Sequence, residues 1–198
     1  MHYLAKILVP ACALLWVSGV AVAGDKLSAA EELQILNEGY SLLYGGVSGA
    51  SNANKVFLVK LESAETQQVV EATTDYLAKL SGQLEQLAED YPSLRLDLQP
   101  LPKVEKQKQS AANIARIKSF APVTGRTGAD FERTLLFTLS GGLNQFRYLA
   151  QVLAEGERSE QRRDFLENAK TQMDKHYNAM LELLSERFYV HDTYTQAE

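Results

Sequence analysis

Apolar residues recur every three or four positions along most of this chain, and that spacing gathers side chains onto one face of an α-helix. No two segments show the alternating pattern of a paired set of β-strands. Several long helices with one apolar face each must bury those faces against one another, so the pattern predicts an all-α antiparallel four-helix bundle. The long helices are expected at about residues 28–47, 64–90, 130–156 and 159–187.

Two of the expected helices begin with a capping box. In the first, the Ser28 hydroxyl accepts from the backbone N–H of Glu31, and the Glu31 carboxylate reaches back to Ser28. Thr127 to Asp130 has the same spacing and predicts the start of the helix at 130–156. Tyr91-Pro92 ends the helix at 64–90, because proline disfavours a helical residue before it.

Two glycine pairs interrupt the helical pattern. Gly45-Gly46 and the small residues up to Asn54 predict a break in the first helix, or a close backbone approach. Gly141-Gly142 lies inside a long helix, where each glycine costs about 1 kcal/mol against alanine. We therefore expect close contact with a facing helix there, with Tyr40 or Tyr44 as the large partner. A ligand cavity at this gap is the alternative.

Between the expected helices at 64–90 and 130–156 lies an extended Pro/Leu linker at residues 93–102. Its alternation of leucine with Arg95 and Asp97 indicates extended chain, and without a partner strand it is expected to lie over the bundle. A shorter helix is expected at 104–120, with lysines and arginines outward and these residues inward: Val104, Ala111, Ile114 and Ile117. Residues 55–61 also have a helical pattern.

The first 23 residues have the pattern of a secretory signal. Lys6 precedes a nearly unbroken apolar run at 7–22, and Ala21-Val22-Ala23 offers the small residues that a signal peptidase needs. We expect cleavage after Ala23, periplasmic or secreted localisation and no membrane span afterwards. The run is shorter than the roughly 20 residues that cross a bilayer, so a retained anchor is the alternative. Lipidation at Cys12 is disfavoured, because too few apolar residues precede it.

Cleavage would leave a single helical-bundle domain at 24–187 and a flexible tail at 188–198. Cys12 is the only cysteine, so the mature chain would hold no disulfide, thiol nucleophile or thiolate metal site. It would keep all 25 acidic residues while losing one of 20 basic ones. An acidic domain is a poor nucleic-acid binder, so the partner is expected to be an unknown periplasmic protein or a small ligand.

No motif for a reaction is present. The sequence has no Glu-x-x-His, no His-Glu-x-x-His and no glycine-rich phosphate loop, so we predict no catalytic residue and no cofactor. His176 is the one candidate ligand, on an apolar stripe between Met173 and Met180. A core or boundary histidine satisfied by one carboxylate or carbonyl is the first interpretation. A metal ligand and a pH-responsive or partner contact are the alternatives.

Several tyrosines lie on or beside the apolar stripes, where boundary packing or an aromatic-lined groove would explain them. The acids Glu71, Asp75 and Glu85 are interpreted as a solvated helix face. Candidate contact regions are residues 45–54 and 94–101, and the aromatic residues near the C-terminus. The candidate binding residues are Tyr40, Tyr44, Gly141, Gly142, His176 and Tyr177.

Three segments together resemble the secreted bacterial ferritin-like domains of unknown function: Leu61–Glu65, Thr127–Arg133 and Ala169–His176. The resemblance covers most of residues 30–185 and implies a ferritin-like bundle. Members commonly carry two further histidines, at places that hold Leu77 and Leu143 here. If the family scaffold holds a metal, this departure implies that the chain has lost it.

The sequence therefore leads to three hypotheses. The first is an exported, non-catalytic helical bundle that acts by binding a partner or a ligand through its surface. The second is a ferritin-like carboxylate metal-binding protein that uses glutamates and His176. The third is a small-ligand carrier built around Gly141-Gly142 and nearby tyrosines.

Overall fold

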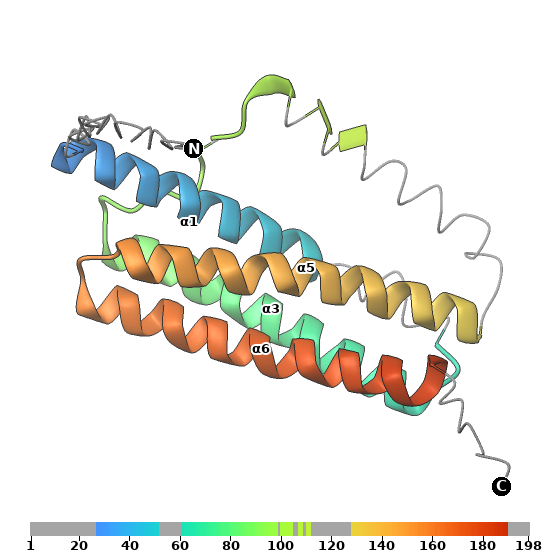
Figure 1. Cartoon of the computed structure of the whole chain (residues 1–198). Coiled ribbons are helices and arrows are strands. Elements are labelled where there is room, and N and C mark those ends of the chain that lie inside the picture. Colours follow the sequence, from blue (N-terminus) through green and yellow to red (C-terminus); the bar gives the residue numbers. More distant parts are fainter. Residues whose placement is uncertain are drawn as a thin grey trace, which may run out of the picture.

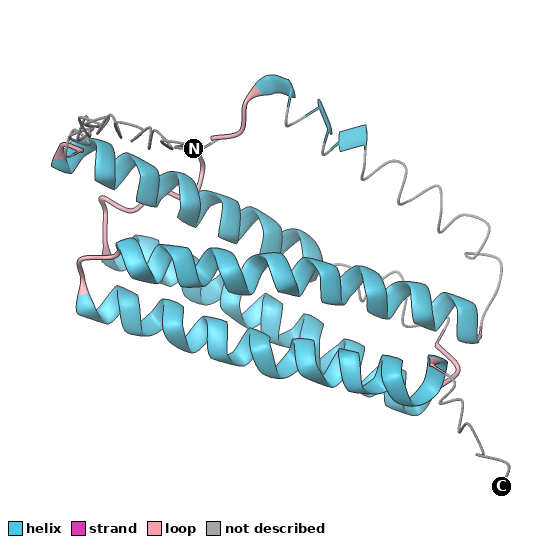
Figure 2. Ribbon diagram, in the orientation of Figure 1, coloured by secondary structure: helices cyan, strands magenta, loops and turns pink. Residues whose placement is uncertain are grey.

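The computed structural model describes residues 27–51, 61–98, 100–104, 107–108, 110–111 and 128–189. In these ranges the regular structure is helical, without strands, which confirms the all-α prediction (Figure 2). None of the helices in these ranges combines the length and apolar character that a membrane crossing requires. The long helices are α1 (Ala29–Ser51), α3 (Ala64–Asp90), α5 (Ala129–Gly156) and α6 (Glu160–Phe188).

The four helices form a ring in which α1 packs on α3 and α5, and α6 packs on the same two (Figure 1). On α1, Gly39 lies against Leu153 of α5 and Gly46 lies against Phe146. On α6, Ala169 accepts from the Tyr76 hydroxyl of α3 and Arg187 donates to the Thr66 hydroxyl. The end of α3 and the start of α5 therefore lie at opposite ends of the bundle.

Local capping explains where most helices begin. Ser28 N–H donates to Glu31 at 2.8 Å and Glu31 N–H donates to the Ser28 hydroxyl at 3.3 Å, so the first capping box is confirmed. Ser63 and Ser159 cap α3 and α6 in the same way, by accepting from backbone N–H groups. The α3 bounds match the prediction of 64–90.

The predicted capping box at the start of α5 is wrong in its position. The N-cap is Gly128, at a φ of 107° that favours glycine, and it makes no side-chain hydrogen bond to the helix. Asp130 instead pairs with Arg133 at 3.0 Å on the surface. Thr127 lies outside the described residues.

The apolar spacing of the sequence places Val69 and Tyr76 on the inward face of α3 and Phe165 on that of α6, and the structure shifts both faces by one residue. On α3, Val70 and Leu77 are buried, whereas Val69 and Tyr76 are half-buried. On α6, Leu166 is buried and Phe165 is half-buried. Apolar residues occupy adjacent positions in both helices, so the sequence fits two slightly different buried faces. The neighbouring helix determines which of the two is buried. The largest fully buried side chains include Tyr40, Phe131, Leu43, Met173 and Met180.

The predictions for the glycine pairs need correction. α1 continues through Gly45-Gly46 to Ser51, so no break occurs there. Gly46 does make the close approach, to the ring of Phe146. The contact predicted for Gly141-Gly142 is wrong: a Cβ on Gly141 would meet nothing within 4 Å, and Gly142 lies near Phe146 of its own helix.

Gly45 and Gly46 form a matched pair for measuring how much that close approach contributes to the free energy of unfolding. Gly45→Ala should raise the free energy of unfolding by about 1 kcal/mol, because a Cβ there meets open space and alanine favours helix. Gly46→Ala should be about 1–3 kcal/mol less stable than Gly45→Ala, because its Cβ must displace Phe146. Urea unfolding of both variants measures the difference. Equal stabilities would contradict the helix spacing described here.

Two further predictions fall in or near the connection. The expected short helix at 104–120 is described only at its start, where residues 103–104, 107–108 and 110–111 are helical. Val104 and Ala111 are exposed there, with Val104 at 76%, so their predicted inward orientation is wrong. Outside the described residues lie the rest of this segment, the helical pattern before Leu61, the predicted signal at 1–23 and the tail beyond Tyr189.

Candidate binding groove

The first part of the connection lies along α1 as extended chain. The Asn37 amide donates to the carbonyl of Ser93 and accepts from the N–H of Arg95, both at 3.0 Å. One turn later, the Ser41 hydroxyl donates to the Arg95 carbonyl at 3.0 Å and accepts from Leu98 N–H at 3.2 Å. Both side chains are buried, and they satisfy main-chain N–H and C=O groups as a neighbouring β-strand would. Residues 93–98 are therefore held in place without a β-sheet.

The side chains of residues 94–97 divide between the core and the solvent. Leu94 is buried, with 6% of its surface exposed, and Leu96 packs partly against the core. Arg95 and Asp97 project outward and pair through two hydrogen bonds, of 2.9 and 2.8 Å. The Arg95 guanidinium lowers the pKa of Asp97. The connection therefore adds an apolar floor and a charged edge to the surface of the bundle.

An open groove of about 470 Å³ lies between this segment, α1 and α3. Its floor is apolar and its rim carries three carboxylates against one guanidinium. The Tyr44 hydroxyl donates to the Glu85 carboxylate across the α1–α3 boundary at 2.6 Å, and this hydrogen bond raises the pKa of Tyr44. The groove is lined by Tyr44, Glu85, Ala88, Glu89, Leu94, Arg95, Leu96 and Asp97.

The two helices beside the groove are strongly acidic. α1 carries Glu31, Glu32 and Glu38 and no lysine or arginine, and α3 carries six acids against Lys79 alone. Charges of one sign on neighbouring elements add to a field that attracts the opposite sign. The groove is therefore an apolar surface within a negative one.

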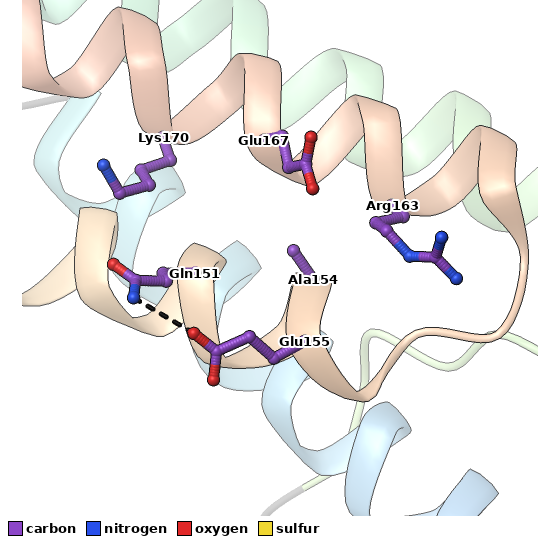
Figure 3. Close-up of a pocket in the computed structure, with 6 residues that line it drawn as sticks. All are labelled: Gln151, Ala154, Glu155, Arg163, Glu167 and Lys170. Atoms are coloured by element: carbon purple, nitrogen blue, oxygen red, sulfur yellow. Dashed lines mark hydrogen bonds between the residues drawn. The ribbon is translucent and has the colours of Figure 1, made fainter.

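A second hollow, between α5 and α6, has a different character (Figure 3). It measures about 370 Å³, and its charged side chains are two acids and two bases. Gln151 donates to Glu155 at 3.0 Å, and Lys170 pairs with Asp174 at 2.7 Å. Glu167 and Arg163 are the other two charged side chains that line this hollow (Figure 3). This hollow has no net charge and serves below as a control surface.

His176 lies half-buried between α3 and α6. Its ring stacks on Tyr76, with the centroids 4.9 Å apart, and its Nδ1 lies 3.4 Å from the Thr73 hydroxyl. That hydroxyl already donates to the Val69 carbonyl at 2.8 Å, so Nδ1 is placed as the donor. The Tyr76 hydroxyl donates to the carbonyl of Ala169, and burial raises its pKa to about 12. No group of three His, Cys, Asp or Glu side chains suited to a metal occurs among the described residues.

The environment of His176 gives a pH dependence with a definite sign. Burial, and secondarily the charge of Lys175, lower the pKa of His176 below 6.5. The neutral ring is therefore favoured in the folded state, and its contribution is lost as the pH falls from about 6.5 through the folded pKa. An NMR titration should give a midpoint below 6.5, and His176→Gln should flatten the stability profile between about pH 7 and 5. A midpoint at or above 6.5 would contradict this placement.

The remaining predicted binding residues lie in separate places. Tyr177 faces α5, where the Arg147 guanidinium lies 4.2 Å from its ring centroid. Tyr40 is fully buried, and Gly141 is on the outer face of α5. Of the six predicted residues, only Tyr44 lines the groove.

Sequence reasoning named Tyr44 and residues 94–101 as contact candidates but missed the α3 side of the groove, which Glu85, Ala88 and Glu89 line. Glu85 was interpreted as part of a solvated helix face, and exposed acids on a helix do look like that. A usable signal was the pair Asn37 and Ser41, which places polar side chains four residues apart beside apolar ones on the inward face.

Buried charge occurs at the two ends of the bundle. The Glu157 side chain, 1% exposed, accepts from the Tyr40 hydroxyl at 3.1 Å, from Ser159 N–H at 3.0 Å, and from Arg162 at 2.9 and 2.8 Å. Burial acts to raise the pKa of Glu157, but these donors outweigh it and the pKa is lowered. The cluster ties α1 to the α5–α6 turn.

At the opposite end, Glu132 of α5 is also 1% exposed. It accepts from the backbone N–H groups of Glu62 and Ser63 at 2.9 and 2.8 Å, and from the Thr66 hydroxyl at 3.0 Å. Arg187 pairs with it at 3.1 Å. Both buried glutamates are thus satisfied by structural partners and are not placed to serve a ligand.

Comparison of the chain with protein-family models, with curated proteins and with solved structures finds no match in any of the three.

Proposed function

We propose that this chain is an exported, non-catalytic protein that acts by binding a partner in the groove between α1, α3 and residues 93–98. The observation that carries the proposal is the combination of an apolar floor, from Leu94 and Leu96, with a rim of acidic side chains. Hydrogen bonds from Asn37 and Ser41 preorganise one wall of the groove. Preorganisation lowers the entropic cost of binding.

The chemistry of the groove selects a cationic, amphipathic polypeptide. Apolar side chains of such a partner would cover Ala88 and Leu96, and lysine or arginine would pair with Glu85 and Glu89. The acidic surfaces of α1 and α3 would steer a positive partner toward the site.

We further propose that the fold belongs to the ferritin-like class. In its support, four helices with antiparallel neighbours and one long crossover, here between α3 and α5, are features of that class. The metal-binding alternative gains no support from the surroundings of His176, which are Tyr76 and Thr73. Export after cleavage at Ala23 predicts a mature protein that begins at Gly24, and intact-mass measurement of the secreted product would test it.

Calorimetric titration with a short peptide of alternating lysine and leucine tests the binding proposal. We expect saturable one-to-one binding to the protein, and no binding of a peptide of alternating glutamate and leucine. The Glu85→Gln/Glu89→Gln variant should bind the cationic peptide about tenfold more weakly, because two charge pairs of up to about 1 kcal/mol each are lost. Glutamine keeps an acceptor for Tyr44, so folding should be unaffected.

The matched control is Glu155→Gln/Glu167→Gln, which removes two acids from the hollow between α5 and α6 (Figure 3). It changes the net charge by the same amount and should leave peptide affinity unchanged. Equal weakening by both double variants would mean that the peptide responds to net charge alone, and would overturn the proposed site.

A further inference from the structure

The chain itself contains a segment with the chemistry that the groove selects. Residues 100–111, here called the basic stretch, contain Lys103, Lys106 and Lys108 against the single acid Glu105. Lys103 and Lys108 are exposed. Val104 is apolar and yet 76% exposed, so the bundle to which it belongs does not cover it. The basic stretch is thus cationic and offers an apolar side chain to another surface.

None of the described residues of the basic stretch lines the groove of its own chain. The chain leaves the groove at Asp97, and residues 100–104 lead away from the four helices (Figure 1). The described residues of the basic stretch therefore lie apart from the groove. A contact between two such different surfaces is a head-to-tail contact, which needs a second molecule.

We propose that the acidic groove of one copy binds the basic stretch of a second copy of this chain. The inference rests on the proposed function and names its partner. Charge complementarity between the carboxylates of Glu85 and Glu89 and the ammonium groups of Lys103 and Lys108 carries it. Val104 would lie against the apolar floor. Association driven by exposed charges weakens as the ionic strength rises.

Sedimentation velocity of the mature protein, with two charge-reversal variants, tests this contact. The wild type should self-associate at low ionic strength and dissociate in about 1 M salt, where the Debye length falls to about 3 Å. Glu85→Lys/Glu89→Lys and Lys103→Glu/Lys108→Glu should each remain monomeric. Their equimolar mixture should form heterodimers again, because the intact groove of one variant meets the intact basic stretch of the other and the two reversed surfaces are also complementary. All four sites are exposed, and circular dichroism would verify that both variants are folded.

The outcomes separate this inference from the function on which it rests. A monomeric wild type that still binds the lysine–leucine peptide would overturn the second copy as partner and leave the groove proposal standing. Failure of both measurements would overturn both. Self-association without heterodimer formation in the mixture would show that the copies meet elsewhere, and would also overturn the inference.

Discussion

Replacing Glu157 by alanine is expected to lower the free energy of unfolding by about 3–5 kcal/mol. The variant would leave the Arg162 guanidinium, 14% exposed, without its carboxylate, and the fully buried Tyr40 hydroxyl without its acceptor. Leaving a buried charge without its partner strongly lowers stability, because no opposite charge then offsets the free-energy cost of removing it from water. Urea unfolding followed by circular dichroism measures the change from the shift in midpoint.

The control is Asp130→Ala, which removes an exposed ion pair with Arg133. Its expected cost is about 0–1 kcal/mol, because water screens the pair. A Glu157→Ala variant as stable as Asp130→Ala would show that Glu157 is not buried as described.

Acid should weaken the same cluster. Because the folded pKa of Glu157 lies below its ordinary value of 4.5, its contribution is complete above that pH and is lost as the pH falls through the folded pKa. Glu157→Gln should therefore be less stable at neutral pH and show a shallower acid dependence than the wild type.

Replacing Glu132 by alanine should have the second largest effect, a loss of about 3 kcal/mol. Two partly buried backbone N–H groups, of Glu62 and Ser63, and the buried Thr66 hydroxyl would lose their acceptor, at about 1 kcal/mol for each lost hydrogen bond. Arg187 is 29% exposed and can turn partly toward water, which limits its own contribution. Urea unfolding measures the total, and faster hydrogen exchange of the two N–H groups would locate it.

Glu65→Ala is the matched control, because Glu65 lies 3.7 Å from the same Arg187 but is 76% exposed. It should cost no more than about 1 kcal/mol. The clusters of Glu132 and Glu157 lie at opposite ends of the bundle, so the double variant should show additive losses. A strongly non-additive result would contradict two independent clusters.

The features of the fold that could be predicted are those that depend on residues close together in the sequence. The α3 helix begins after Ser63 and ends before Tyr91-Pro92, where a hydroxyl cap and a proline act within a few residues. The Ser28–Glu31 capping box and the end of α5 at Gly156 have the same local origin.

Features that depend on contacts between helices could not be read reliably. Gly46 and Gly141 are chemically identical and both lie within helices, yet only Gly46 faces a large side chain of a neighbour. Tyr44 was predicted as a binding residue, whereas Glu89 was not, because the groove exists only once residues 93–98 lie over α1. Asn37 makes that contact with main-chain atoms of Ser93 and Arg95, so the sequence shows an inward polar residue but not which segment it holds.

Hydrogen–deuterium exchange with and without the saturating lysine–leucine peptide tests the proposed binding site most directly. The peptide should slow exchange at residues 85–98 and around Tyr44, which form the groove, and leave residues 151–170 of the opposite hollow unchanged. Protection at 151–170 without protection at 85–98 would contradict the acidic groove as the binding surface of this protein.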